Sequence, residues 1–462
     1  MEYFTSASDP ERVSCKHYRS CSYTVVVQQL AISLCTILIL TQMAVGQNAH
    51  EDDVLIGPIS IRLTESPVDD SSTFAAKDSQ RKDFLKRWRK LAAIYSSSED
   101  PLIQELKFIG RVHYQYGLVD GSVVGNDVNY ETDEMRRFRL GLSAKFLKNW
   151  DLYAEAEMSD DQRPRGGELD IRFKHMYQFK MQLDMKNAFD LDGVDGFKLG
   201  IGSREINMSY EWVTSSKRIK TVERSAIANK IWAYNSEFAN PTGIWFIAER
   251  EPVTWTLGAF STTQHDWVAP FNDGELYYSN VHWDLQNGPD NEETDLRWTM
   301  FLQDVSAGDE VLAGGLDWAT AVSIQRKRGP WEFHLEGIYG NNGDQLNANR
   351  EGDFWGIVVM PSYWLIQDSL EAVFRYQYQG SREIEGIRLN SRYIRRAGAR
   401  DGFPSLANGR GDEHHSCYLG LHKLIRSHHQ KIMAGVEYDS LLQNGNQLFG
   451  SWSAMVAYRM YW

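Results

Sequence analysis

The sequence has few cysteines and no long hydrophobic run. Three of its four cysteines precede residue 36, so a chain without that N-terminal stretch would keep Cys417 alone and could form no intramolecular disulfide. The longest apolar core, residues 30–40, holds about eleven residues, whereas a membrane-spanning helix needs roughly twenty. The mean hydropathy of −0.46 is also too polar for a bundle of membrane helices. These shortages exclude a disulfide-stabilised domain and a helical membrane protein.

Catalytic and metal-binding motifs are also absent. The sequence contains no nucleophile elbow, phosphate-binding loop or paired-cysteine motif, so we expect no enzyme and no cofactor. Five histidines gather near the C-terminus, and imidazoles can bind metals, but they fall at opposite ends of one expected strand, so we expect no metal site. They are His414, His415, His422, His428 and His429. We expect no nucleic-acid partner.

The N-terminal segment has the pattern of a secretory signal. Arg12, Lys16 and Arg19 precede the apolar core, and Gly46 completes a small-x-small cleavage site. We therefore expect a signal peptide over residues 1–46, in preference to a membrane anchor. Residues 47–104 show no sustained strand alternation, and their apolar residues at 84–91 have helical spacing, which predicts a periplasmic or plug segment that is partly helical or disordered.

The last eleven residues alternate between an apolar face and a mixed face. Successive side chains of a strand point to opposite sides of a sheet, so one side is wholly apolar. Its members are Trp452, Ala454, Val456, Tyr458, Met460 and Trp462. Such a strand, ending the chain on an aromatic residue, is typical of an outer-membrane β-barrel.

Similar two-residue periodicity recurs throughout residues 105–462. We count about fifteen segments, yet bacterial single-chain barrels have an even number of strands, with short periplasmic turns alternating with long extracellular loops. That alternation fails between 263 and 295, where a weak strand at 278–285 restores it. The sequence therefore predicts an all-β fold: a transmembrane antiparallel β-barrel of about 16 strands. A barrel of this size leaves an aqueous channel, and residues 207–243 become the third extracellular loop, which we expect to fold inward.

Several of these segments resemble the phosphate-selective porin family, porins O and P. The resemblance lies in residues 136–142, in residues 197–202 with the loop motifs that follow at 211–225, and in the last two strands at 431–438 and 457–459. It implies a homotrimeric sixteen-stranded channel in the outer membrane. It also implies that arginines and lysines of the lumen and third loop carry anions.

Charge placement agrees with that implication although the net charge is −13. Two long loops, 204–230 and 382–400, are locally basic. Whether the second loop enters the lumen stays open, and an outward loop is favoured. We expect the third loop to provide an anion path through Arg204, Lys217, Arg218, Lys220, Arg224 and Lys230. We expect the first strands to place in the lumen Arg111, Arg137, Arg139, Lys145, Glu155 and Glu157. Opposite charges on neighbouring strands there predict cross-strand neutralisation rather than a transverse field.

The sequence thus predicts an outer-membrane porin, exported by signal cleavage near Gly46, in contact with membrane lipid. It would pass small hydrophilic solutes by diffusion with a bias toward anions, and phosphate or polyphosphate are the candidate solutes. The alternatives are a general or sugar-type pore without anion preference, a barrel with a plugged lumen, and a secreted carbohydrate-binding β-sandwich.

Overall fold

The computed structural model describes residues 92–123, 126–159, 171–233, 240–262, 274–285, 292–305, 315–344, 347–389 and 409–462. The chain divides into two compact units, Met1–Asp70 and Ser71–Trp462, and everything described lies in the second. The predicted signal peptide and the predicted helical stretch at 84–91 lie outside the described residues.

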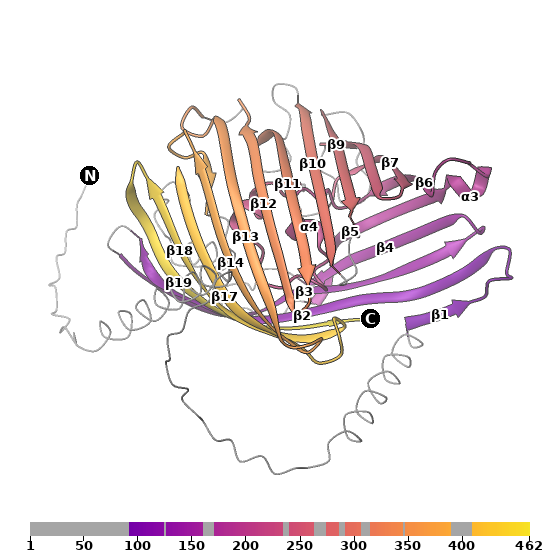
Figure 1. The fold of residues 1–462 in the computed structure, drawn as a ribbon, viewed down its shortest axis with the longest axis horizontal. Helices are drawn as coiled ribbons and strands as arrows, with labels where there is room; N and C mark the ends of the chain where they lie inside the picture. The colour runs from indigo at the N-terminus through magenta and orange to yellow at the C-terminus, as the bar shows by residue number, and fades with distance from the viewer. Residues whose placement is uncertain are drawn as a thin grey trace, which may run out of the picture. The chain divides into compact units, whose positions relative to one another are not determined.

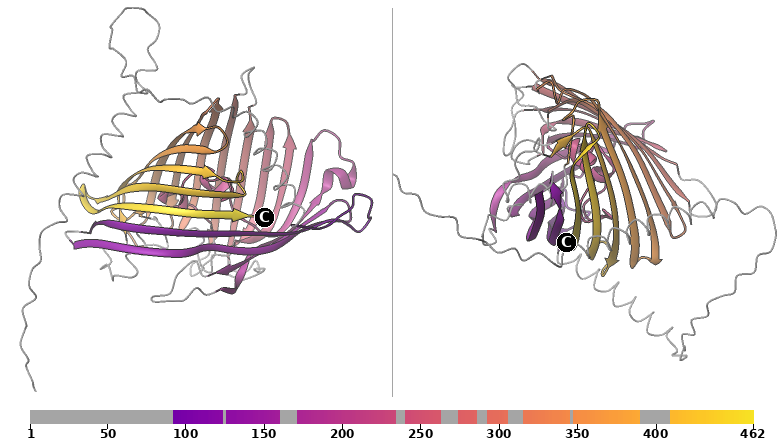
Figure 2. Two further views of the ribbon diagram at one scale, coloured as in Figure 1. Left: turned by 90° about the horizontal axis from the view of Figure 1, so that it is seen from below. Right: turned by 90° about the vertical axis from the view of Figure 1, so that its left-hand side faces the viewer.

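Sixteen antiparallel strands close into a barrel (Figure 1). The strands are β2 (Ile103–Val123), β3 (Asn126–Phe146), β4 (Trp150–Ser159), β5 (Ile171–Asp184), β6 (Gly196–Ser203), β7 (Thr242–Arg250), β8 (Val253–Ser261), β9 (Gly274–Asp284), β10 (Glu293–Val305), β11 (Leu316–Arg328), β12 (Trp331–Asn342), β13 (Gly352–Ile366), β14 (Leu370–Ser381), β17 (Glu413–Leu424), β18 (Gln430–Gln443) and β19 (Asn446–Tyr461). Each pairs with its neighbours in this order, and β19 pairs with β2 to complete the ring. Figure 2 shows this seam, where the yellow C-terminal strand runs beside the indigo β2. The predicted barrel of about sixteen strands is confirmed.

Two-residue alternation in the sequence becomes an inner and an outer face. In β12, Trp331, Phe333 and Leu335 are exposed on the outside, whereas His334 and Glu336 between them are only 1% exposed. Apolar residues on the outer face suit lipid, and polar residues on the inner face suit an aqueous lumen. In β19, the mixed face of the final strand, which alternates with the apolar face, is likewise buried, as the sequence pattern predicted.

The weak strand inferred from loop parity is present. β9 pairs with β8 over nine positions and with β10 over eleven, so it is a full member of the barrel wall. It begins at Gly274, four residues before the predicted start. The requirement for an even number of strands therefore identified a strand whose own two-residue alternation is weak.

A short additional strand lies in the segment where no strand was expected. β1 (Ala93–Ser96) pairs with residues 105–107 of β2. At this end of the barrel β19 has already ended, because Trp462 makes the last backbone bonds to Gly110. β1 therefore covers backbone groups of β2 that the closing strand leaves open.

The remaining elements lie in turns and loops. Helix α3 (Met185–Phe189) joins β5 to β6, and the pair β15 (Ile387–Arg388) and β16 (Arg410–Gly411) lies between β14 and β17. No helix within the described ranges has the length and apolar character needed to cross a membrane. We call the barrel end that carries the short turns and Trp462 the turn end, and the opposite end the loop end.

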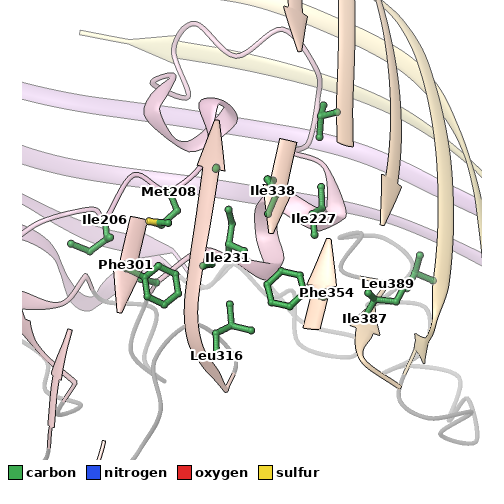
Figure 3. Packing of buried hydrophobic residues seen from close by; sticks show 14 of the residues in the cluster. Ile206, Met208, Ile227, Ile231, Phe301, Leu316, Ile338, Phe354, Ile387 and Leu389 are labelled. Carbon is green, nitrogen blue, oxygen red and sulfur yellow. The ribbon is translucent and has the colours of Figure 1, made fainter. Parts of the chain in front are cut away.

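The loop between β6 and β7 lies inside the barrel, which confirms the inward-folded third loop. It carries α4 (Tyr210–Val213) and α5 (Ala226–Lys230), which begin at the capping hydroxyls of Ser209 and Ser225. Its apolar residues face the inner surface of β10–β13, as Figure 3 shows. The loop residues drawn there are Ile206, Met208, Ile227 and Ile231, and the wall residues are Phe301, Leu316, Ile338 and Phe354.

Candidate functional site

The third loop leaves a polar pocket between itself and the strands on the other side of the lumen. The pocket has a volume of about 250 Å³. Its wall side is formed by Arg111, Arg137, Arg139, Tyr153, Tyr177, Gln178 and Lys180, and its loop side by Glu205, Val213, Ser215, Ser216 and Arg224. Five of these residues are cations and one is a carboxylate, so the pocket is the candidate functional site.

Two irregular positions in the strands bring extra side chains to the pocket side. The β4–β5 register passes from Glu155 opposite Gln178 to Ala156 opposite Met176, which leaves Tyr177 as an extra residue. A bulge of this kind breaks the strict alternation of faces, so Tyr177, Gln178 and Lys180 all line the pocket.

The second irregularity lies between β2 and β3 and concerns Arg136. His113 lies opposite Arg137, and Tyr114 lies opposite Met135, so Arg136 is the extra residue. Its Nε lies 2.9 Å from an oxygen of Glu223 in the third loop. A residue that strict alternation would place on the outer face therefore binds the loop from inside.

Two of the wall arginines, one in β2 and one in β3, are paired with carboxylates of β4. Arg111 donates to both oxygens of Glu155 at 2.9 and 3.0 Å, and Arg139 donates to Glu157 at 2.6 Å. The Arg139 guanidinium also lies 3.1 Å from the centre of the Tyr177 ring. These pairs hold the guanidinium groups in place and neutralise them, which is the cross-strand pairing that the sequence suggested.

Arg137 is different because its partner is a histidine. Its Nη1 lies 3.3 Å from Nδ1 of His113, and the residue is only 6% exposed. Within the part of the chain that the structure describes, no ion pair joins Arg137 to a carboxylate. Arg137 thus adds a positive charge to the pocket that no bonded anion cancels.

The loop side contributes Arg224. Its guanidinium lies 3.9 Å from the centre of the Trp212 ring, and its Nε donates to the backbone oxygen of Glu211 at 2.7 Å. The loop touches the wall directly, because Arg111 donates to Oγ of Ser216 at 3.0 Å. Carbonyl and aromatic partners orient Arg224 without cancelling its charge.

The charges of the pocket and its bonded carboxylates add to a positive total. The five cations are Arg111, Arg137, Arg139, Lys180 and Arg224, and the three carboxylates are Glu155, Glu157 and Glu205, which leaves two positive charges in excess. Fixed cations beside a narrow aqueous path attract anions and repel cations. The arrangement can therefore hold a small anion and let it leave again.

Of the residues predicted to carry anions, Arg111, Arg137, Arg139 and Arg224 come together in this pocket. Lys220 lies elsewhere, between Glu332 and Glu371, with its Nζ 2.9 Å from Glu332. This loop cation is therefore neutralised by two carboxylates of the wall.

The other predicted loop cations are spread along the lumen. Lys217 approaches Nε2 of His429 at 3.0 Å near the turn end, and Arg218 is exposed. Arg204 lies 5.0 Å from the Trp245 ring. Lys145, predicted to face the lumen, is exposed near the β3–β4 turn.

Lys230 lies at the loop end of the lumen, outside the membrane-spanning strands. Its Nζ donates to Oδ1 of Asn342 at 2.7 Å. Burial, together with the nearby cations Arg410, Arg350 and Arg388, lowers the pKa of Lys230 to about 7. Its charge therefore changes near neutral pH.

The histidines do not form a metal centre in the ranges that the structure covers. Nε2 of His414 lies 2.9 Å from Asp439, and Nδ1 of His422 lies 3.3 Å from Glu371. Among the described residues, no group of three histidine, cysteine or acidic side chains is arranged to hold a metal ion.

Comparison with known proteins agrees with this architecture. The family model of phosphate-selective porin O and P matches residues 106–284. No curated relative matches the chain.

The structural comparison finds solved outer-membrane proteins at low identity and with TM-scores below 0.5. OmpT of Vibrio cholerae is 12% identical with a TM-score of 0.44, and the match covers 78% of this chain and 97% of that one. OprB of Pseudomonas putida is 9% identical with a TM-score of 0.48, covering 77% and 94%. The channel DcaP of Acinetobacter baumannii is 11% identical with a TM-score of 0.43, covering 79% and 99%.

The closed barrel excludes the β-sandwich alternative. The family match confirms the resemblance seen in the sequence, over the eight wall strands from β2 to β9 and the loops between them. Residues 106–284 of this closed sixteen-stranded barrel match the model of the phosphate-selective porin O and P family.

Proposed function

We propose that this porin passes small hydrophilic anions by diffusion along the side of the lumen formed by β2–β5. The observation that carries the proposal is the excess of two positive charges around the pocket. Arg137 contributes to this excess because it is buried and its bonded partner is His113 rather than a carboxylate. Charges that line a constriction set selectivity more strongly than the net charge of the whole protein. The net charge of −13 therefore does not oppose an anion path.

Phosphate, or polyphosphate, is the solute that we propose within this class. Arginine donors held by neighbouring groups match the oxygen geometry of phosphate, and charge-assisted hydrogen bonds to it are strong. Arg111 and Arg139 are held by carboxylates, while Arg224 is held by a carbonyl oxygen and an aromatic ring. The resemblance to the porin O and P family supports the same solute, and it also supports a homotrimer.

The sugar-type pore is the second candidate because Tyr153 and Tyr177 line the pocket. Cations lie over both rings, however: Lys180 over Tyr153 at 5.0 Å and Arg139 over Tyr177 at 3.1 Å. A ring face occupied by a cation is not open for stacking on a sugar. This arrangement favours anions over neutral sugars.

For the parts of the chain outside the described residues, the proposals rest on the sequence. We propose that residues 1–46 direct export and are cleaved near Gly46, and that most of residues 47–104 form a periplasmic or plug segment.

Planar-bilayer recording of the purified protein tests the proposed function. In a gradient of potassium chloride, the zero-current potential should have the sign of chloride permeation. Added phosphate should block the chloride current if phosphate binds in the pocket. A cation-selective potential would contradict the anion proposal, and the lack of any channel activity would support a barrel with a plugged lumen.

A further inference from the structure

We propose that Arg375 of β14 is a positioning residue that sets the selectivity of the channel by holding the third loop, and with it Arg224, against the anion path. The proposal rests on the proposed function of the pocket as that path. Arg375 lies outside the pocket and does not touch it, so it would act only through the loop.

Arg375 makes four hydrogen bonds, and three of them reach the third loop. Its Nη1 donates to Oε1 of Glu211 at 2.7 Å, to the backbone oxygen of Glu223 at 2.9 Å, and to Oγ1 of Thr221 at 3.2 Å. Its Nη2 donates to Oε1 of Glu437 in β18 at 2.8 Å. The side chain is only 1% exposed. One buried guanidinium thus joins both arms of the loop to the barrel wall.

The bonded carboxylate of Glu211 continues this connection to Arg224. Its Oε2 accepts the backbone N–H of Ser225 at 2.9 Å and also the Ser225 hydroxyl. The backbone oxygen of the same Glu211 accepts Nε of Arg224 at 2.7 Å. A continuous chain of hydrogen bonds therefore runs from the β14 wall through Glu211 to the guanidinium that faces the pocket.

The rest of the loop is held separately. Nζ of Lys431 donates to the backbone oxygen of Ile219 at 2.7 Å, and Nη1 of Arg459 donates to the backbone oxygen of Ser216 at 3.2 Å. These contacts hold the part of the loop near the turn end and do not involve Glu211 or Arg224. Glu223, beside Arg224, is held by Arg136 at 2.9 Å and by Gln115 at 2.7 Å. Loss of Arg375 should therefore release Glu211 and α4, which orient the Arg224 side chain, while the loop stays in the lumen and the barrel stays closed.

A buried charge without its partner is unfavourable, so the released carboxylates should move toward water. Glu211 belongs to the loop and can move, whereas Glu437 is fixed in a strand. The expected change is a displacement of α4, which removes the carbonyl and ring partners that orient the Arg224 side chain toward the pocket and widens the path.

The first part of the test compares four single variants with the wild type, and a second part uses Arg224→Gln alone and combined with Arg375→Met. Arg375→Met and Glu211→Gln remove the two ends of the main contact, and Arg375→Lys keeps the charge. Arg382→Gln removes a charge from an exposed loop residue of the same chain and is the matched control. Each protein is first checked for heat-modifiable gel migration, which shows that the barrel is closed.

Two readouts follow. The chloride-to-potassium permeability ratio should fall roughly three- to five-fold in Arg375→Met and in Glu211→Gln. It should fall less in Arg375→Lys and stay unchanged in Arg382→Gln. Uptake of uncharged sugars of graded size into liposomes should extend to larger sugars in Arg375→Met and Glu211→Gln. The double variant Arg375→Met with Arg224→Gln should have the same permeability ratio as Arg224→Gln alone, because both changes remove one guanidinium from the path.

An unchanged permeability ratio and an unchanged sugar limit in a closed Arg375→Met barrel would overturn the proposal. If that variant does not fold, Glu211→Gln decides the question, because Glu211 lies in the loop and not in the wall. If the wild type shows no anion preference, the proposed function fails, but the sugar limit still reports whether Arg375 holds the loop.

Discussion

Replacing Arg137 by glutamine removes one buried charge from the pocket and keeps a polar side chain at this position. An anion that passes about 6 Å from the guanidinium gains roughly 2.8 kcal/mol at an effective dielectric constant near 20, and about 0.7 kcal/mol in bulk water. Salt at physiological strength reduces either value by about half. The change should therefore be about 1 kcal/mol, which is roughly a fivefold fall in the chloride-to-potassium permeability ratio.

The measurement is the zero-current potential of single channels in a potassium chloride gradient, repeated at low and high salt. The fall should be larger at low salt, since screening there weakens less the interaction between Arg137 and the anion that the variant loses. Arg382→Gln removes an equal charge from an exposed site and should leave the ratio unchanged. An unchanged ratio in Arg137→Gln, or an equal fall in both variants, would refute the assignment of the path to this pocket.

Three further outcomes are expected. Gly356→Ala should lower the free energy of unfolding in urea by about 1–3 kcal/mol, because the added Cβ would lie 2.6 Å from Ile227 of the third loop. The control Gly337→Ala, which has open space around the added Cβ, should change this free energy by less than about 0.5 kcal/mol. The anion preference should decrease as pH rises through about 7, because Lys230 is protonated below its lowered pKa and neutral above it; recordings of Lys230→Gln should lack this step. Trp462→Ala should lower the unfolding free energy by about 1–2 kcal/mol, since the ring of Trp462 packs against Phe108 and Gly110 beside the closing seam. Gel migration over a series of temperatures measures the unfolding transition, and an unchanged transition temperature would contradict this prediction.

The barrel could be predicted from the sequence because its physical cause is local. Each wall residue must face either lipid or lumen, so the period of two is visible in each segment, as in the final strand from Trp452 to Trp462. Even β9, with weak alternation, followed from the parity of turns and loops. β1 was missed because it is four residues long and exists only to cover the part of β2 beyond the end of β19.

The membership of the pocket could be predicted only in part. Arg137 and Arg139 follow from alternation, but Tyr177 and Lys180 lie at or beyond a bulge that shifts the faces, and the bulge depends on the pairing of β5 with β4.

The environment of each loop cation depends on residues far away in the chain. Lys220 is neutralised by Glu332 and Glu371, more than a hundred positions later, and Lys230 bonds to Asn342. These contacts depend on how deeply the loop enters the barrel. Local charge counts cannot distinguish a loop cation that faces water from one paired with the wall.

The most direct test of the anion path is to reverse two charges that face each other across it. The double variant Arg137→Glu with Arg224→Glu turns an excess of two positive charges into an excess of two negative charges. Its zero-current potential in a potassium chloride gradient should have the opposite sign to that of the wild type. If a closed double-variant barrel keeps the anion-selective sign, the path does not run between these two residues.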